Sequence, residues 1–308
     1  MKSLLTISAL YAVVITITAS PGKAPVKQLN DGNLIPVLAL GTFGMDDIPQ
    51  VRQAINWAVE SGYRHIDTAA YYENEAEIGK GIADVIKKGL VKREELFITT
   101  KLWNDKHARN QVVPALRDSL RKLGLSYVDL YLIHSPAATT SNGSPLDIDY
   151  LETWQGMEEA KRLGLAKSIG VSNFNISQID RIIANSKIAP AINQIEVHPS
   201  NTQEGLILEC HERGIHVMAY SPFGFFVSRS GVSRPEVNDP KILNIAAKYG
   251  KSLTQVVLRY LLDRDLIPIP KSIKLKRLGE NINVFDFQLT PEEVSTISSF
   301  NTNSSVFD

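Results

Sequence analysis

Four polar residues lie at or just beyond the ends of short β-rich runs in the sequence. They are Asp67, Tyr72, Lys101 and His134. Tyrosine has an ordinary pKa of about 10 and is a poor acid near neutrality. A nearby ammonium favours the phenolate and so strengthens the hydroxyl as an acid. If the fold brings these side chains together, Lys101 can supply that charge to Tyr72.

The two other residues complete a proton-donating set. A carboxylate at Asp67 would hold Lys101 in place and partly compensate its burial, and a neutral His134 could orient a substrate oxygen. Together the four would protonate a carbonyl oxygen as hydride arrives at its carbon. Each residue alone is weak support, because such an Asp often caps a helix, a Tyr often packs in a core, and a lone His is usually structural.

The elements that must position these residues alternate along the chain. Eight runs are predicted as strands, at 38–40, 65–68, 96–101, 128–134, 168–171, 192–197, 216–220 and 267–269. Helical patterns lie between them, including 48–61, 73–88, 111–123, 150–162 and 176–184. This alternation predicts an α/β fold, a closed (β/α)8 TIM barrel. The rival, an open doubly wound sheet, usually carries a G-x-G-x-x-G loop, and the sequence contains none.

The sequence also indicates how the predicted barrel begins and where its longer loops lie. Asp31-Gly32 lies between two apolar runs, which predicts an N-terminal β-hairpin acting as a lid or plug. Longer irregular segments at 136–146 and 222–239 are expected at the barrel face that carries the site, as candidate walls and lids. No linker rich in Pro, Gly or Ser divides the chain, so residues 23–308 are predicted to form one domain.

The amino-acid composition limits the classes of molecule that the protein is expected to bind. Lys plus Arg and Asp plus Glu both number 33 among 308 residues, so no overall field favours nucleic acid or an acidic membrane surface. We expect a small-molecule partner and a monomer. Cys210 is the only cysteine, which excludes an internal disulfide. The six histidines form no H-x-x-x-H pattern and no cluster with that cysteine, so no metal is expected.

The first 22 residues resemble a secretory signal peptide. Lys2 precedes an uncharged apolar run at 4–19, followed by small residues. The run is short for a membrane span and no basic cluster follows it, so we expect no stable anchor. If the chain is exported, Asn142, Asn175 and Asn303 become candidate glycosylation sites. The alternatives are a buried N-terminal helix and a cytoplasmic protein.

Several longer motifs carry a resemblance to a known family. They read GYRHIDTA at 62–69, TKLW at 100–103, DLYLIH at 129–134, GLAKSIGVSNF at 164–174 and PKS at 270–272. In type, order and spacing they resemble the aldo-keto reductases, over essentially everything after the leader. The resemblance implies that Tyr72 is the general acid, Lys101 and Asp67 its supporting pair, and His134 the orienting residue. With the leader, the likeness extends to the insect 3-dehydroecdysone reductases.

The nicotinamide end of a cofactor would lie among groups from several strands. Ser172, Asn173 and Gln194 are suited to hold a carboxamide, or simply to bond one another at the barrel mouth. Tyr220, followed by Ser221, ends the seventh strand, where the family places the nicotinamide ring; on sequence alone it reads as a core tyrosine. By resemblance, the cofactor-side loop after the first strand adds Gly41 and Thr42.

The adenosine end of the cofactor is expected beyond the eighth strand. Five residues there match the spacing with which related reductases bind NADP, namely Lys271, Ser272, Arg277, Glu280 and Asn281. Lysine and arginine donors suit a 2′-phosphate, and a helix N-terminus would add dipolar stabilisation. Because Lys271 and Arg277 are both present, NADPH is favoured over NADH.

The substrate side is predicted to be apolar. By resemblance, Phe43 and Trp103 wall the pocket together with Tyr72 and His134, and Phe223, Phe225 and Phe226 would add apolar surface. The expected function is NADPH-dependent reduction of a ketone or aldehyde, in particular an ecdysteroid ketone such as 3-dehydroecdysone. The alternatives are a broad detoxifying reductase of aldehydes, dicarbonyls or quinones, an NADPH-binding redox sensor or steroid-binding barrel with little turnover, and a bulk structural protein.

Overall fold

The barrel predicted from the sequence is present in the computed structural model, which describes residues 24–227 and 238–307. Eight parallel strands pair in chain order: β3 (Leu40–Gly41), β4 (His65–Asp67), β5 (Phe97–Leu102), β6 (Val128–Ile133), β7 (Ala166–Ser172), β8 (Ile192–Glu196), β9 (His216–Tyr220) and β10 (Ile267–Pro268). Backbone bonds from Ala39 N to Pro268 O (3.1 Å) and from Gly41 N to Pro270 O (3.0 Å) join the first strand to the last. The sheet therefore closes on itself.

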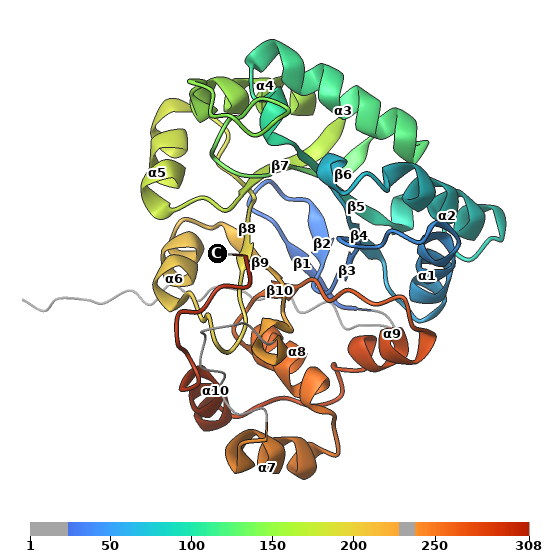
Figure 1. Ribbon diagram of the computed structural model, residues 1–308, viewed down its shortest axis with the longest axis vertical. Helices are drawn as coiled ribbons and strands as arrows, with labels where there is room; N and C mark the ends of the chain where they lie inside the picture. The colour runs from blue at the N-terminus through green and yellow to red at the C-terminus, as the bar shows by residue number, and fades with distance from the viewer. Residues whose placement is uncertain (1–23, 228–237, 308) are drawn as a thin grey trace, which may run out of the picture.

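Helices surround this sheet (Figure 1). They are α1 (Ile48–Glu60), α2 (Glu75–Lys87), α3 (Arg109–Leu123), α4 (Tyr150–Arg162), α5 (Ile176–Asn185), α6 (Glu204–Glu212), α7 (Pro240–Tyr249), α8 (Leu253–Asp263), α9 (Leu275–Ile282) and α10 (Pro291–Ser298). In α3, Val112, Leu116, Leu120 and Leu123 recur at helical spacing and are buried, and Gly124 ends the helix at φ +67°. Amphipathic patterning thus places the helices around the barrel.

The strand ends agree with the predicted ranges to within about two residues. Helix α2 begins later than predicted, because a short 3-10 helix, η1 (Ala70–Tyr72), and Glu73 at φ +55° come first. Three further 3-10 turns lie at Arg93–Glu95, Asn104–Lys106 and Gly224–Phe226. The turn at η1 is important because it carries Tyr72 to the barrel mouth.

The predicted N-terminal hairpin closes the opposite end of the barrel. It pairs β1 (Val26–Gln28) with β2 (Leu34–Pro36). Asn30 Nδ2 donates to Pro190 O (2.9 Å), and His216 Nε2 lies 2.9 Å from Gln28 O. Ile35 packs into one apolar cluster with barrel residues such as Leu130 and Met218. The plug seals the amino ends of the strands, so the carboxyl ends provide the open face.

Two buried histidines make the fold sensitive to acid. Burial lowers the pKa of His65 to about 3 and that of His107 to about 4. An unfolded histidine has a pKa of about 6.5, so between these values the unfolded chain binds more protons than the folded one. The free energy of unfolding should therefore fall by up to about 1.4 kcal/mol per pH unit for each histidine as the pH drops below 6.5.

Urea titrations at pH 7, 6 and 5 measure this dependence. The variant His107→Leu removes the contribution of His107 and should show a shallower fall in the free energy of unfolding than the parent protein. A free energy of unfolding that stays constant over this range would contradict the assignment.

Candidate active site

A cavity of about 550 Å³ opens at the carboxyl ends of the strands. Thirteen residues predicted for the site line it, namely Gly41, Thr42, Phe43, Asp67, Tyr72, Trp103, His134, Ser172, Asn173, Gln194, Tyr220, Ser221 and Lys271. Because parallel strands end at one edge, residues distant in sequence meet here. The predicted convergence is therefore present.

A buried lysine lies at the centre of the site. Lys101, on β5, is fully buried and donates from Nζ to Asp67 Oδ1 (2.6 Å), to Thr68 O (3.1 Å) and to the Tyr72 hydroxyl (3.1 Å). The second carboxylate oxygen of Asp67 accepts from Gln194 Nε2 (2.8 Å). Lys101 thus bonds both Asp67 and Tyr72, and Gln194 bonds Asp67, a contact that the sequence did not indicate.

The charges of this cluster reinforce the ammonium form of Lys101. Burial alone lowers the pKa of Lys101, but Asp67 and Tyr72 outweigh it, and the pKa lies above its ordinary value. For Tyr72, burial raises the pKa and outweighs the opposing effect of Lys101, so this pKa also lies above its ordinary value. The expected lowering by the ammonium is therefore present, but it is smaller than the effect of burial.

The position of Tyr72 depends on a residue that sequence reasoning missed. Asn74 is buried, and its Nδ2 donates to Thr42 O (2.9 Å) and Met45 O (3.3 Å). It thereby ties the segment after Tyr72 to the loop after β3. The sequence offered only an asparagine near the start of the predicted helical range 73–88, and an asparagine there indicates a helix cap and not a link between loops.

His134 follows β6 and its ring faces the cavity. Burial, and secondarily the charge of Lys101, lower the pKa of His134 to about 3, which agrees with the predicted neutral form. Its Nδ1 is buried and has no hydrogen-bond partner within the residues described. The rings of Trp103 and Tyr72 lie edge-on to it, at 5.0 and 5.8 Å between centroids. A neutral imidazole therefore lies beside the rings of Trp103 and Tyr72 at the cavity.

The groups predicted to hold a carboxamide lie together across β7, β8 and β9. Ser172 Oγ donates to Gln194 O (2.8 Å), and Asn173 Nδ2 donates to His134 O (2.9 Å). The Tyr220 hydroxyl donates to Asn173 Oδ1 (2.9 Å). These residues therefore bond neighbouring groups at the barrel mouth and also line the cavity, and their binding of a carboxamide stays a prediction.

The residues predicted for the adenosine end lie outside the cavity wall, except for Lys271. Arg277 is on the exposed face of α9, Ser272 and Asn281 are buried, and Glu280 lies 3.8 Å from Lys276. Neither Lys271 nor Arg277 is ion-paired within residues 24–227 and 238–307, and both are exposed. Two available cations suit a phosphate, so this donor set fits NADP(H).

Aromatic side chains form the outer wall of the cavity. Phe43 packs on Tyr72 with centroids 5.2 Å apart, and Trp103 stacks on Tyr71 at 3.8 Å. Sequence reasoning missed Tyr71, and it also missed Val306 and Phe307 of the C-terminal segment, which line the cavity. No periodic pattern marks that segment.

The prediction for the loop after β9 is partly wrong. Phe223 lines the cavity, but Phe225 is 1% exposed and packs in the core against Phe300, with centroids 5.6 Å apart. Phe226 packs edge-on to Phe225 at 5.3 Å and is not part of the wall. The short turn at Gly224–Phe226 directs these two rings inward. Residues 228–237 of the predicted loop lie outside the described residues, as does the predicted signal peptide.

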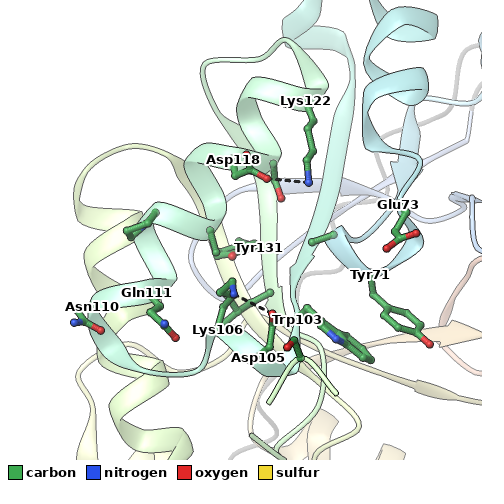
Figure 2. A pocket seen from close by; sticks show the side chains of 16 residues that line it. Tyr71, Glu73, Trp103, Asp105, Lys106, Asn110, Gln111, Asp118, Lys122 and Tyr131 are labelled. Atoms are coloured by element: carbon green, nitrogen blue, oxygen red, sulfur yellow. Dashed lines mark hydrogen bonds and ion pairs between the residues drawn. The ribbon is translucent and has the colours of Figure 1, made fainter. Parts of the chain in front are cut away.

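Trp103 and Tyr71 line the active-site cavity and also line a second hollow of about 660 Å³, which Figure 2 shows. Two lysines face this hollow, but each is ion-paired: Lys106 with Asp105 (2.9 Å) and Lys122 with Asp118 (2.8 Å). Residues 136–146 contribute only Ser141, which lines this outer hollow and not the active-site cavity. The loop after β6 is therefore not the wall that was predicted.

A closed β/α barrel whose strands end at a cavity with aromatic walls and a cluster of Asp67, Lys101 and Tyr72 belongs to a class of barrel enzymes. Residues 37–302 match the family described as "Aldo/keto reductase family", and the chain belongs to this family of oxidoreductases. Along residues 24–227 and 238–307, no helix has the length and apolar character needed to cross a membrane.

Known relatives cover nearly the whole chain. "Aldo-keto reductase AKR2E4" of Bombyx mori is 61% identical over 293 residues, covering 93% of this chain and 95% of the relative. Its crystal structure in complex with NADP has a TM-score of 0.91 to this chain. The aldo-keto reductase AKR2E5 complexed with NADPH is 43% identical, with a TM-score of 0.89 and coverage of 92% and 89%. "Aldose reductase C" of Dictyostelium discoideum is 42% identical, with coverage of 90% and 89%.

Proposed function

We propose that this protein reduces a ketone or aldehyde to an alcohol with NADPH, and that Tyr72 is the general acid. The observation that carries the proposal is the buried Lys101 ammonium, which bonds both Asp67 and the Tyr72 hydroxyl at the open end of the barrel. Family membership supports the reductase activity. Within the proposal, residues 23–308 act as one monomeric barrel domain.

When bound, NADPH supplies the hydride that reaches the carbonyl carbon. The Tyr72 hydroxyl donates its proton to the carbonyl oxygen, which completes the alcohol and leaves a phenolate on the enzyme. The Lys101 ammonium at 3.1 Å stabilises that phenolate as it forms, and Asp67 fixes the lysine. Neutral His134 binds the substrate oxygen and orients it toward the hydroxyl.

The cofactor is proposed to lie across the carboxyl ends of the strands. Its nicotinamide end would be held by Gly41, Thr42, Asp67, Ser172, Asn173, Gln194, Tyr220 and Ser221, and its adenosine end by Lys271, Ser272, Arg277, Glu280 and Asn281. The available cations Lys271 and Arg277 favour the 2′-phosphate of NADPH over NADH. Two similar solved structures hold NADP or NADPH, which supports this choice.

The proposed substrate is a bulky, largely apolar ketone, and the specific candidate is an ecdysteroid ketone such as 3-dehydroecdysone. Phe43, Trp103, Phe223 and Phe307 give the cavity aromatic walls, and its volume is about 550 Å³. An insect reductase at 61% identity is consistent with such a substrate. The proposed leader at 1–22 would direct the protein to the secretory pathway.

A comparison of three substrates tests the substrate proposal. NADPH consumption by the purified protein is measured with 3-dehydroecdysone, a simple aldehyde and a dicarbonyl. The expected result is at least a tenfold preference in kcat/KM for the steroid, which corresponds to about 1.4 kcal/mol of transition-state discrimination. Comparable rates on all three would instead identify a general detoxifying reductase. No turnover on any of them would favour a sensor or binding protein.

A further inference from the structure

The C-terminal segment reaches the active-site cavity along the loop that follows β8. Ser200 O accepts from Thr302 N (3.1 Å) and from Ser304 N (3.0 Å), and Asn301 Oδ1 accepts from Thr202 N (3.2 Å). Residues 301–304 are therefore fixed to this loop by several bonds. These bonds end at Ser304, and the cavity wall at Val306 and Phe307 lies beyond them.

One buried carboxylate holds the next residues. Glu196, the last residue of β8, is 4% exposed. It accepts from Ser305 Oγ at 2.8 Å through Oε2, and from the backbone N–H of Val306 through Oε1. The same Oε1 lies 2.9 Å from Nε2 of His198, which is 1% exposed. Both carboxylate oxygens are thus used, and two of their donors belong to the C-terminal segment.

The surroundings leave this segment little freedom to shift inward. A Cβ on Gly224 would lie 2.3 Å from the His198 ring and 2.6 Å from a methyl group of Val306. Three segments therefore meet with no room for a further side chain. Beyond them, the Phe307 ring lies 5.9 Å from the rings of both Phe43 and Tyr220, on the outer side of the cavity.

We propose that Glu196 is a positioning residue that sets selectivity for bulky substrates by holding Val306 and Phe307 as a wall of the cavity. Glu196 does not line the cavity, so it acts only through the segment it holds. A large ketone needs that wall in place, whereas a small aldehyde contacts little of it. The inference rests on the proposed reductase function.

The kinetic test compares Glu196→Ala and Glu196→Gln with a matched control, Asp129→Asn. Asp129 is also a 4% exposed carboxylate that accepts a backbone N–H, from Ile98 (3.0 Å), but it lies at the amino end of β6. Glu196→Ala should raise KM for the bulky ketone at least tenfold. KM for a small aldehyde and the Kd of NADPH should stay within twofold of their values in the parent protein. Glu196→Gln keeps an acceptor oxygen, so its KM for the bulky ketone should lie between those of the parent protein and Glu196→Ala.

A truncated chain lacking residues 305–308 separates positioning from a general structural role. If Glu196 acts through the segment, Glu196→Ala should change KM for the bulky ketone by less than twofold in the truncated chain. A further tenfold change there would overturn the proposal. The proposal would also be overturned if, in the full chain, Glu196→Ala and Asp129→Asn changed KM for the bulky ketone and KM for the small aldehyde by equal factors.

A second readout does not need turnover. Carboxypeptidase release of the C-terminal residues, followed by mass spectrometry, should be at least tenfold faster in Glu196→Ala than in the parent protein or Asp129→Asn. If the parent protein reduces neither substrate, the proposed function fails while this assay still tests the anchor. Equal release from all three proteins would overturn the anchor itself.

Discussion

Tyr72→Phe is expected to lower kcat for a small aldehyde by about 10²–10⁴-fold, the range that general acid catalysis contributes. The substitution removes only the hydroxyl oxygen, which lies 3.1 Å from Lys101 Nζ. The ring keeps its packing against Phe43, so the cavity keeps its shape. The loss should therefore appear in kcat, with the Kd of NADPH and the free energy of unfolding nearly unchanged.

Stopped-flow kinetics and NADPH titration of the purified variant check this expectation. Tyr127→Phe is the matched control, because Tyr127 lies at the amino end of β6, between Arg93 and Lys167, far from the cavity. It should keep the parent kcat. If Tyr72→Phe retained more than a tenth of the parent kcat, the proton would have to come from another group.

Much of this site follows from the sequence because local patterns fix the strands. Once the strand ends near Asp67, Lys101 and His134 are known, barrel topology requires these residues to meet at one edge. Because these strands are neighbours in the barrel, side chains at their ends lie within contact distance of one another. The family motifs span the same strand ends, which explains why the resemblance and the physical argument selected the same four residues.

The features that were missed depend on contacts between distant segments. Phe307 follows a segment that is bonded to Glu196 and Ser200, more than a hundred residues earlier in the chain. Phe225 was misplaced because an irregular loop has no periodicity that tells which ring turns inward. The raised pKa of Tyr72 reflects a balance between burial and charge, and residue types give only the charge.

Lys101→Met is expected to cost both activity and stability. The lysine is fully buried, and among residues 24–227 and 238–307 it and Gln194 are the side chains that donate to the Asp67 carboxylate, so its removal leaves a buried charge with the Gln194 amide. Breaking a buried pair in this way costs about 3–5 kcal/mol. The Tyr72 hydroxyl also loses the ammonium that stabilises its phenolate, so kcat should fall by at least about 10²-fold.

A second substitution separates these two losses. Asp67→Asn in the Lys101→Met background removes the unpaired charge, while its amide oxygen can still accept from Gln194 Nε2. Urea unfolding should then show recovery of most of the lost free energy, because neutral partners replace a buried charge. Activity should not recover, because no ammonium faces Tyr72. If kcat returned together with stability, Lys101 would serve only to compensate Asp67, and its electrostatic role toward Tyr72 would have to be abandoned.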